Sequence, residues 1–154
     1  MAAGAGRPVV ALKRLPGNDD LPAPGRATPG SSGFDLRAAL TEEVRLQPGE
    51  RRLIPTGFAV AIPEGYEGQV RPRSGAALKQ GLALPNAPGT IDSDYRGEVA
   101  VILINLGQEG VTLRRGDRIA QLVIAPVARA SFEEVDELPA SDRGAGGFGH
   151  TGTR

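Results

Sequence analysis

The sequence predicts an all-β barrel or sandwich with one short helix. Turn signals recur at short intervals, and each one bounds a run of strand length. Only residues 74–80 have the composition of a helix. Short strands separated by Gly- and Pro-containing turns are typical of β-sandwiches and barrels. The turn signals lie at residues 48–49, 63–65, 88–89, 107–110 and 115–116.

Composition limits the classes of function. The 154 residues fit a single domain that can bury a core, and 18 basic residues balance 18 acidic ones. No overall positive field therefore exists to hold nucleic acid or an anionic membrane. With no cysteine and one histidine, a disulfide framework, thiolate chemistry and a polyhistidine metal site are excluded. Neither a signal-peptide core nor a bilayer-spanning stretch is present, so we expect a cytoplasmic protein.

The first predicted strands cover residues 9–12 and 52–62. Between them, prolines and glycines in residues 16–30 interrupt the chain too often for a helix. Apolar side chains alternate along residues 52–62, as expected for a strand with one apolar face. That face carries Ile54, Thr56, Phe58, Val60 and Ile62.

The helix is predicted over residues 74–80. Ser74 is a candidate N-cap, and Gly81 follows the last helical residue as a stop signal. Because Arg73 precedes it, the hydroxyl and free backbone amides at this helix start can hold an anion such as phosphate. The alternative is a plain N-cap next to a solvated arginine.

The stretch of residues 86–98 lies between two apolar runs and is predicted to form a hairpin. Pro88-Gly89 and Ser93-Asp94 are its turn signals. Asp92 and Tyr95 then lie beside a rigid loop, where a carboxylate and a phenol can line a small polar pocket. The alternative is an ordinary turn, in which Asp92 forms an Asx-turn and the Tyr95 ring packs.

A last strand pair is predicted over residues 118–135, and a tail begins at Pro139. The tail matches the dinucleotide pattern GxGxxG at residues 144–149, but that fingerprint needs a preceding strand and a following helix. A disordered glycine tail and a lid that orders over a ligand are the better interpretations. Residues 136–148 reach on the order of 40 Å when extended at about 3.4 Å per residue, enough to reach another subunit.

Five stretches that combine glycine with charged residues occur in order along the chain. Each is a weak signal alone, but together they resemble the five motifs of the homotrimeric deoxyuridine triphosphate nucleotidohydrolases (dUTPases). Two positions depart from the family pattern: Ser32 stands where alanine is usual, and His150 where serine is common. The stretches are Ser32-Gly33-Phe34-Asp35-Leu36, Pro72-Arg73-Ser74-Gly75, Gly89 to Glu98, Gly116 to Leu122 and Arg143 to Gly152.

This resemblance implies both a fold and a reaction. The fold would be a distorted jelly roll or β-clip barrel over residues 1–137, with residues 138–154 as a flexible glycine-rich lid. The reaction would be Mg2+-assisted attack of water on the α-phosphate of dUTP, giving dUMP and diphosphate. It would keep uracil out of DNA and supply dUMP for thymidylate synthesis. Active sites would lie between the subunits of a homotrimer.

The resemblance also assigns roles to individual residues. Asp92 would be the general base that activates the water, and Tyr95 would pack under the deoxyribose and exclude a 2′-hydroxyl. Mg2+ would be held mainly by the triphosphate, with Asp35 contacting it only through water. Uracil would meet Asn86, backbone groups of Thr90, Ile91, Asp92 and Ala100, and the stacked ring of Phe148; the phosphates would meet Arg73, Ser74, Gly75, Gln121 and Arg143.

Two other functions compete with this interpretation. A dCTP deaminase, or a bifunctional deaminase and dUTPase, would share the fold and some motifs, and ammonia release from dCTP would distinguish it. A trimer that binds nucleotides or proteins without catalysis is the other alternative. It would have no evident use for Asp92 together with Tyr95, Arg143 and Phe148.

Overall fold

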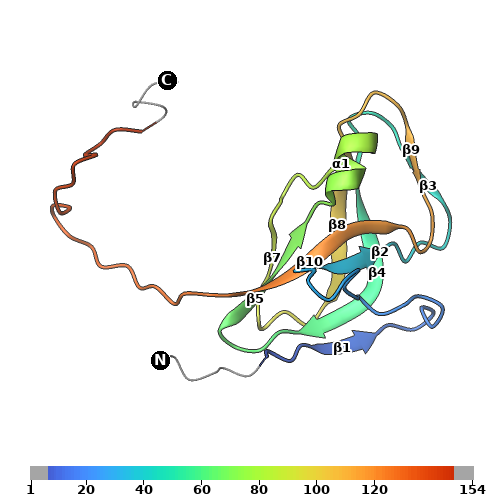
Figure 1. Ribbon diagram of the computed structural model, residues 1–154, viewed down its shortest axis with the longest axis horizontal. Helices are drawn as coiled ribbons and strands as arrows, with labels where there is room; N and C mark the ends of the chain where they lie inside the picture. The colour runs from blue at the N-terminus through green and yellow to red at the C-terminus, as the bar shows by residue number, and fades with distance from the viewer. Residues whose placement is uncertain (1–6, 148–154) are drawn as a thin grey trace.

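The computed structural model describes residues 7–147, in which two four-stranded sheets and one two-stranded sheet surround a single core (Figure 1). The four-stranded sheets have the orders β1-β4-β8-β6 and β2-β10-β5-β7, β3 pairs with β9, and all pairs are antiparallel. The elements are β1 (Ala11–Arg14), β2 (Phe34–Arg37), β3 (Val44–Leu46), β4 (Arg51–Ala61), β5 (Tyr66–Arg71), α1 (Ser74–Gln80), β6 (Leu82–Ala83), β7 (Gly89–Ile91), β8 (Glu98–Asn105), β9 (Val111–Leu113) and β10 (Arg118–Pro126).

The two larger sheets supply the core between them. Leu36, Val70 and Leu122 come from the sheet that contains β10, and Val101 and Leu103 come from the sheet that contains β8. All five side chains are at most 5% exposed. Two sheets that share one apolar interior confirm the predicted all-β class and fit the jelly-roll architecture.

Strand β4 changes its register with β8 where β1 joins its other side. It pairs with β8 up to Pro55, its register shifts before Ala59, and from Phe58 onward it also pairs with β1. Gly57 lies at the shift with φ of 76°, a conformation that favours glycine, and a Cβ there would collide with Asn18. The predicted alternation therefore stops at Thr56, because residues 56–60 are all buried.

The predicted hairpin is wrong. β7 pairs with β5, whereas β8 pairs with β4 and β6 in the other sheet. Residues 92–97 therefore cross from one sheet to the other. Both Gly89 and Ile91 are buried, and the Ile91 side chain packs in the core.

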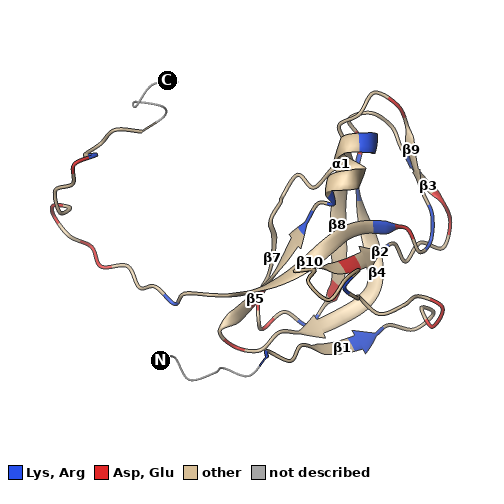
Figure 2. Ribbon diagram, in the orientation of Figure 1, with Lys and Arg blue, Asp and Glu red and all other residues tan. Residues whose placement is uncertain are grey.

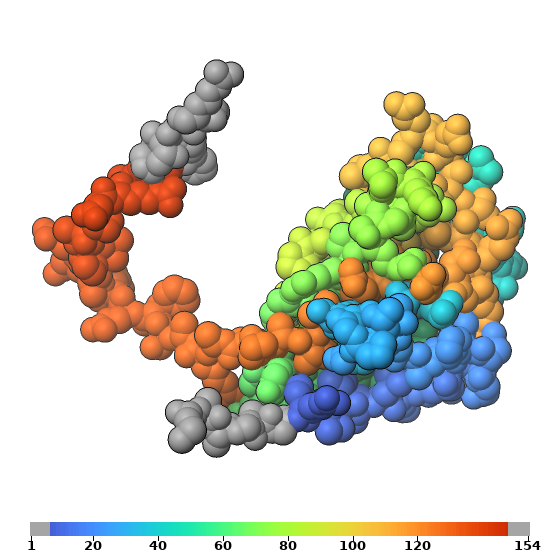
Figure 3. Space-filling model, viewed as in Figure 1, coloured from blue at the N-terminus to red at the C-terminus, as the bar shows by residue number. Residues whose placement is uncertain are grey.

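Two other strand predictions need correction. The first strand covers residues 11–14 rather than 9–12, and the pair expected over 118–135 is one strand that ends at Pro126. β10 already has β2 and β5 on its two sides, so residues 127–135 have no free edge of that strand to pair with. These residues are exposed and leave the body as an extended arm that continues to residue 147 (Figure 3).

Helix α1 has the predicted residues but a different cap. Gly81 ends it in the left-handed conformation with φ of 69°, as expected. The N-cap is Arg73, whose backbone is extended, and Ser74 is already helical. The prediction of Ser74 as N-cap is therefore wrong. No helix among residues 7–147 is long and apolar enough to cross a bilayer.

Candidate active site

Three of the five motifs meet at one cavity of about 320 Å³. Its walls come from the loop before β2, from β2 itself, from the start of α1 and from the middle of β10. Both ionic and uncharged polar groups face it. The lining residues are Ala27, Ser31, Ser32, Gly33, Asp35, Arg73, Ser74, Gly75 and Gln121.

Strand register explains why these motifs meet. On β10, Gln121 lies opposite Asp35 of β2 on one side and opposite Arg71 of β5 on the other. Residues 72–75 follow β5 directly, so the start of α1 reaches the same place. The predicted phosphate residues Arg73, Ser74, Gly75 and Gln121 are thus brought together with Asp35.

Gln121 holds two walls of this cavity in place. Its Nε2 donates to the Pro72 carbonyl at 3.0 Å, which fixes the turn into α1. Its side chain also lies against Gly33, where an added Cβ would collide with Oε1. Gly33 is therefore needed for close approach, and Gln121 fixes the cavity rather than projecting freely into it.

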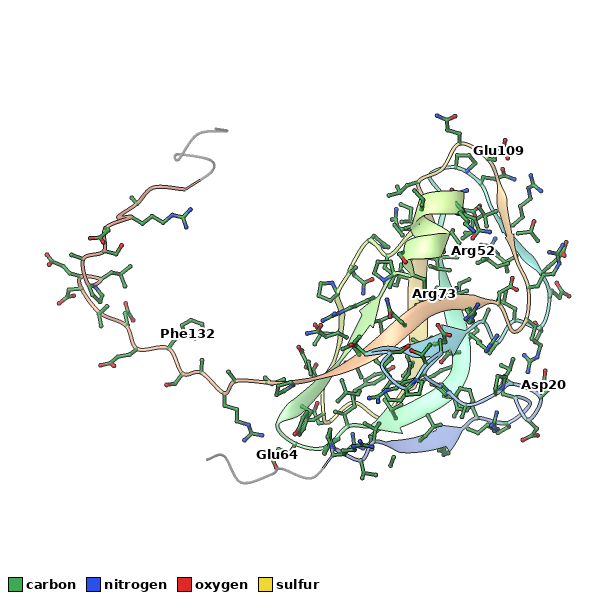
Figure 4. The ribbon with its side chains drawn as sticks, in the orientation of Figure 1. Asp20, Arg52, Glu64, Arg73, Glu109 and Phe132 are labelled. Carbon is green, nitrogen blue, oxygen red and sulfur yellow. The ribbon has the colours of Figure 1, made fainter. Side chains whose placement is uncertain are left out.

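Asp35 forms ion pairs with two arginines at the cavity wall. One carboxylate oxygen lies 3.3 Å from Nε of Arg73, and the other lies 3.2 Å from Nη1 of Arg118. The Asp35 side chain is only 19% exposed. Basic and acidic positions of β10 and β2 accordingly lie close together in Figure 2, and Arg73 is labelled beside β10 in Figure 4. Two cations against one carboxylate leave a net positive charge for an anion.

Sequence analysis missed Arg118. Arg118 belongs to the fourth motif, in which only Gln121 was assigned a role. The structure places it beside Arg73, whose Nη1 donates to the Arg118 carbonyl at 3.1 Å. Only the pairing of β2 with β10 reveals this position, because Arg118 and Asp35 are far apart in the chain.

Asp92 lies elsewhere, at a second cavity of about 400 Å³. Because Ile91 pairs with Gly68, Asp92 is at the Glu67 end of β5, whereas Arg73 follows the opposite end. Six residues of extended chain separate those ends by on the order of 20 Å. One copy of the chain therefore does not bring Asp92 to Arg73, Ser74 and Gln121. The second cavity is lined by Gly65, Tyr66, Glu67, Asp92, Ser93, Asp94, Val127 and Arg129.

The turn that carries Asp92 is closed by backbone and by Tyr95. The Tyr95 amide donates to the Asp92 carbonyl at 3.1 Å, so backbone atoms close this turn and the Asp92 side chain is exposed. The Tyr95 hydroxyl donates to the Glu98 carbonyl at 2.9 Å, and a Cβ at Gly97 would collide with that hydroxyl. The predicted closeness of Asp92 and Tyr95 is thus observed on a rigid connection.

The other expected uracil residues are spread over two sheets. Asn86 is exposed before β7, Thr90 is exposed on β7, and Ile91 is buried there. Ala100 lies on β8 opposite Pro55, in the other sheet, and is half-buried.

The described tail residues stand apart from both cavities. In the arm, Nε of Arg143 donates to the Gly146 carbonyl at 3.0 Å. Phe148 and His150 lie outside the described residues. The structure thus describes no contact between the tail motif and either cavity.

Comparisons with known proteins agree on one family. The family model described as dUTPase matches residues 19–152. The deoxyuridine 5'-triphosphate nucleotidohydrolase of Caulobacter vibrioides is 60% identical over 145 residues, covering 93% of this chain and 94% of the relative. The enzyme of the same name from Aquifex aeolicus is 62% identical over 146 residues, covering 95% and 97%.

Solved structures give the same family. The dUTPase of Staphylococcus bacteriophage 80alpha with dUPNHPP superimposes with a TM-score of 0.81 and 31% identity, covering 94% of this chain and 99% of that one. A mutant dUTPase from phage phi11 of S. aureus, described with a structural Mg(II) ion, has a TM-score of 0.75 and 28% identity. It covers 84% of this chain and 97% of that one.

Proposed function

The chain belongs to the dUTPase family and hydrolyses dUTP to dUMP and diphosphate, and we propose that the reaction occurs between copies of the chain. The cavity beside Arg73 takes the phosphates of the substrate. The turn that carries Asp92 and Tyr95 comes from a neighbouring copy and supplies the base and the sugar contact. The comparisons give no support to the deaminase alternative.

One observation carries this proposal: β5 separates Asp92 from Arg73. A general base must lie within hydrogen-bond reach of its water, directly or through one further water. A separation on the order of 20 Å along an extended strand is too large for both residues to act on one triphosphate. Two copies that meet edge to edge supply both halves, and a ring of three gives three equivalent sites.

The phosphate cavity is suited to an anion. Arg73 is held by Asp35 through Nε and by the Arg118 carbonyl through Nη1, so Nη2 is left to donate to a phosphate oxygen. The Ser74 side chain is exposed at the cavity, where its hydroxyl can donate as well. We propose that Gly75 lets a phosphate approach the backbone closely and that Gln121 holds the cavity wall in place.

The residues present fit a magnesium ion that arrives with the triphosphate. Within residues 7–147, no three acidic or histidine side chains cluster as a metal cage. Asp35 lines the cavity, and a carboxylate has lone pairs left for a water when two arginines contact it. Mg2+ is commonly held by substrate phosphates with few carboxylates, and Asp35 would contact it through water. When bound, the ion draws charge from the phosphates.

Asp92 and its neighbours act on the other end of the substrate. Its exposed carboxylate orients the water that attacks the α-phosphorus and takes a proton from it. Asn86 and the backbone of residues 90–92 bind the uracil edge, with Ala100 contributing only through its backbone. The Tyr95 ring, fixed through its hydroxyl, packs under the deoxyribose.

The arm supports assembly of several copies. Phe132 is fully exposed and Leu138 is 84% exposed, and Figure 4 shows Phe132 well away from the sheets. Leaving both uncovered is unfavourable, since apolar surface is stabilised by burial. We propose that the arm lies on a neighbouring copy, where residues 138–154 close over the substrate. Arg143 then contacts a phosphate and Phe148 stacks on uracil.

An apolar cleft on the body offers a matching surface. It is lined by Val10, Leu12, Phe34, Leu122 and Ile124, and an adjoining hollow includes Arg7 and Arg26. The arm carries acidic residues around its apolar ones, at positions 133, 134, 136 and 137. Opposite charges at the rim and apolar groups at the centre are the usual arrangement of an interface.

Mixed oligomers test the shared site. Asp92→Asn should abolish turnover while leaving nucleotide binding nearly intact, and Arg73→Met should weaken phosphate binding. The two variants are co-expressed with different affinity tags, and oligomers that carry both tags are purified. In a mixed trimer about one third of the sites combine an intact Asp92 from one chain with an intact Arg73 from another.

Release of diphosphate from dUTP is then measured for the mixed and the single-variant oligomers. Because about one of the three sites is intact, a mixed trimer should have about one third of the activity of an unmutated trimer. Oligomers of either variant alone serve as controls and should stay inactive. Mixed oligomers as inactive as the two single-variant oligomers would show that each copy carries its own complete site.

A further inference from the structure

We propose that Arg118 is a positioning residue for hydrolysis, which acts on the phosphates through Asp35 and Arg73. This inference rests on the proposed function, in which Arg73 binds the triphosphate. Arg118 itself does not line the phosphate cavity. Its contribution is to hold Asp35, and thereby to determine which nitrogens of Arg73 remain free.

A β-bulge places Arg118 on the correct face of β10. Gln121 pairs with Asp35 and Ala120 with Leu36, but Arg118 rather than Ile119 pairs with Arg37. Without the bulge, Arg118 would point to the same side as Ala120, into the core. With it, Ile119 and Ala120 are buried in succession while Arg118 faces outward with Gln121.

Arg118 occupies the oxygen of Asp35 that Arg73 does not use. Nη1 of Arg118 lies 3.2 Å from Oδ2, and Nε of Arg73 lies 3.3 Å from Oδ1. A carboxylate with both oxygens free binds an arginine through two parallel hydrogen bonds. If Arg118 were absent, Asp35 could take a second nitrogen of Arg73 in that way. Arg118 therefore keeps a guanidinium edge of Arg73 free for phosphate.

The backbone of Arg118 holds Arg73 as well. Its carbonyl accepts the hydrogen bond from Nη1 of Arg73 at 3.1 Å. A side-chain substitution leaves this carbonyl in place, so it removes only the contact with Asp35. Because that contact uses a single nitrogen, a lysine at position 118 can replace it.

Two variants and one control test the role in the full-length enzyme. Arg118→Met should weaken inhibition by inorganic pyrophosphate and raise KM for dUTP, each about tenfold, which is the size expected for loss of an oriented charged hydrogen bond. Deoxyuridine binding and Tm should be unchanged. Arg118→Lys should restore most of the pyrophosphate affinity. Arg114→Met removes the same charge from an exposed arginine paired with Glu43 and should have no effect.

A double-mutant cycle with Arg73→Met separates positioning from direct contact. In that background, Arg118→Met should change pyrophosphate affinity less than about twofold, because the residue through which it acts is gone. An equal loss in both backgrounds would mean that Arg118 contacts phosphate itself, and would overturn the proposal. A lower Tm with equal loss of deoxyuridine and pyrophosphate binding would show a purely structural role and overturn it too. If Arg73→Met alone leaves pyrophosphate affinity unchanged, the proposed phosphate site is wrong and this inference fails with it.

Discussion

Tyr95 shows how a single side chain can set selectivity for a sugar. Tyr95 is 44% exposed as a residue, but its hydroxyl is bound to the Glu98 carbonyl and packed against Gly97. A ring held at both ends cannot move aside for a larger ligand. The excluded group in our proposal is the 2′-hydroxyl of a ribonucleotide.

Tyr95→Ala should therefore admit UTP. We expect kcat/KM for UTP relative to dUTP to rise about tenfold or more, since a steric exclusion is removed. Tyr95→Phe is the matched variant: it keeps the ring but loses the hydrogen bond to the Glu98 carbonyl, so it should relax the selectivity less than the alanine variant does. Competition between the two nucleotides, measured by diphosphate release, gives the ratio. Unchanged sugar selectivity in the alanine variant would refute the role of the ring.

Asp20 couples stability to pH. Its hydrogen bond with Arg115 lowers the pKa of Asp20 from 3.8 to about 2. Arg115 also donates to the carbonyls of Gly17 and Leu40, so it ties the loop after β1 to the body. A depressed pKa in the folded state means that the ionised carboxylate stabilises the fold.

The Asp20→Asn variant should consequently have a lower Tm than the parent at pH 7. The difference should be nearly full above about pH 4 and should be lost as the pH falls from there through about 2, because the parent carboxylate becomes protonated over that range. Thermal unfolding at a series of pH values measures it. Asp19→Asn removes the same charge one position earlier and serves as the control. A difference in Tm that does not depend on pH would contradict the assignment.

At the scale of elements, Asn105 joins the end of β8 to two other parts of the fold. It is fully buried, and its Nδ2 donates to the carbonyls of Leu46 and Glu109 at 3.0 and 2.7 Å. Its Oδ1 accepts from the Gly107 amide at 2.8 Å. The side chain thus holds β3 and the turn before β9 in place.

Asn105→Ala should destabilise the protein by about 2–4 kcal/mol, because it leaves buried backbone groups without partners. Denaturant unfolding gives this free energy. The control is Gln108→Ala, an exposed change in the same turn, which should stay within about 0.5 kcal/mol of the parent. If the two variants were equally stable, the network around Asn105 would contribute nothing.

The bends and turns of the elements were predicted unevenly from sequence. Gly81 ended the helix and Gly49, Gly65 and Gly116 marked turns, and each has a positive φ. Such signals are local, because only glycine adopts that backbone without strain. The bulge that orients Arg118 was not foreseen, since a bulge depends on the partner strand.

At the scale of the whole molecule, the arm lies outside the folded body but is proposed to be needed for activity. Residues 127–147 contain no helix or strand and are almost entirely exposed. Only their start is tied to the body, by Val127 bonding to Gly65 and Arg129 pairing with Glu64. In our proposal the arm reaches a neighbouring copy, where residues 138–154 form the lid of its site. The boundary between body and lid at residues 137 and 138 stays a prediction.

Deleting residues 140–154 should lower kcat/KM for dUTP about a hundredfold or more, because without the closing segment the substrate is poorly oriented and open to water. Tm should be unchanged, since the described part of the deleted segment, residues 140–147, has no helix or strand and lies outside the two sheets. Sedimentation should still show a trimer, because Phe132 and Leu138 are retained. Full activity of this truncation would exclude the lid, and a stable, active monomer would exclude the shared site.

The sequence alone determined the family, the all-β class and the extent of α1, and it predicted which residue types would bind a nucleotide. These follow from local signals and from five motifs in fixed order. Only the tertiary structure decided that β7 belongs to the sheet of β5 and that Asp92 lies at the opposite end of that strand from Arg73. Turn residues specify where a chain bends, but which strand pairs with which depends on burying apolar faces that are distant in sequence. For that reason the partners of Asp35, and the separation of Asp92 from Arg73 within one copy, could be read only from the fold.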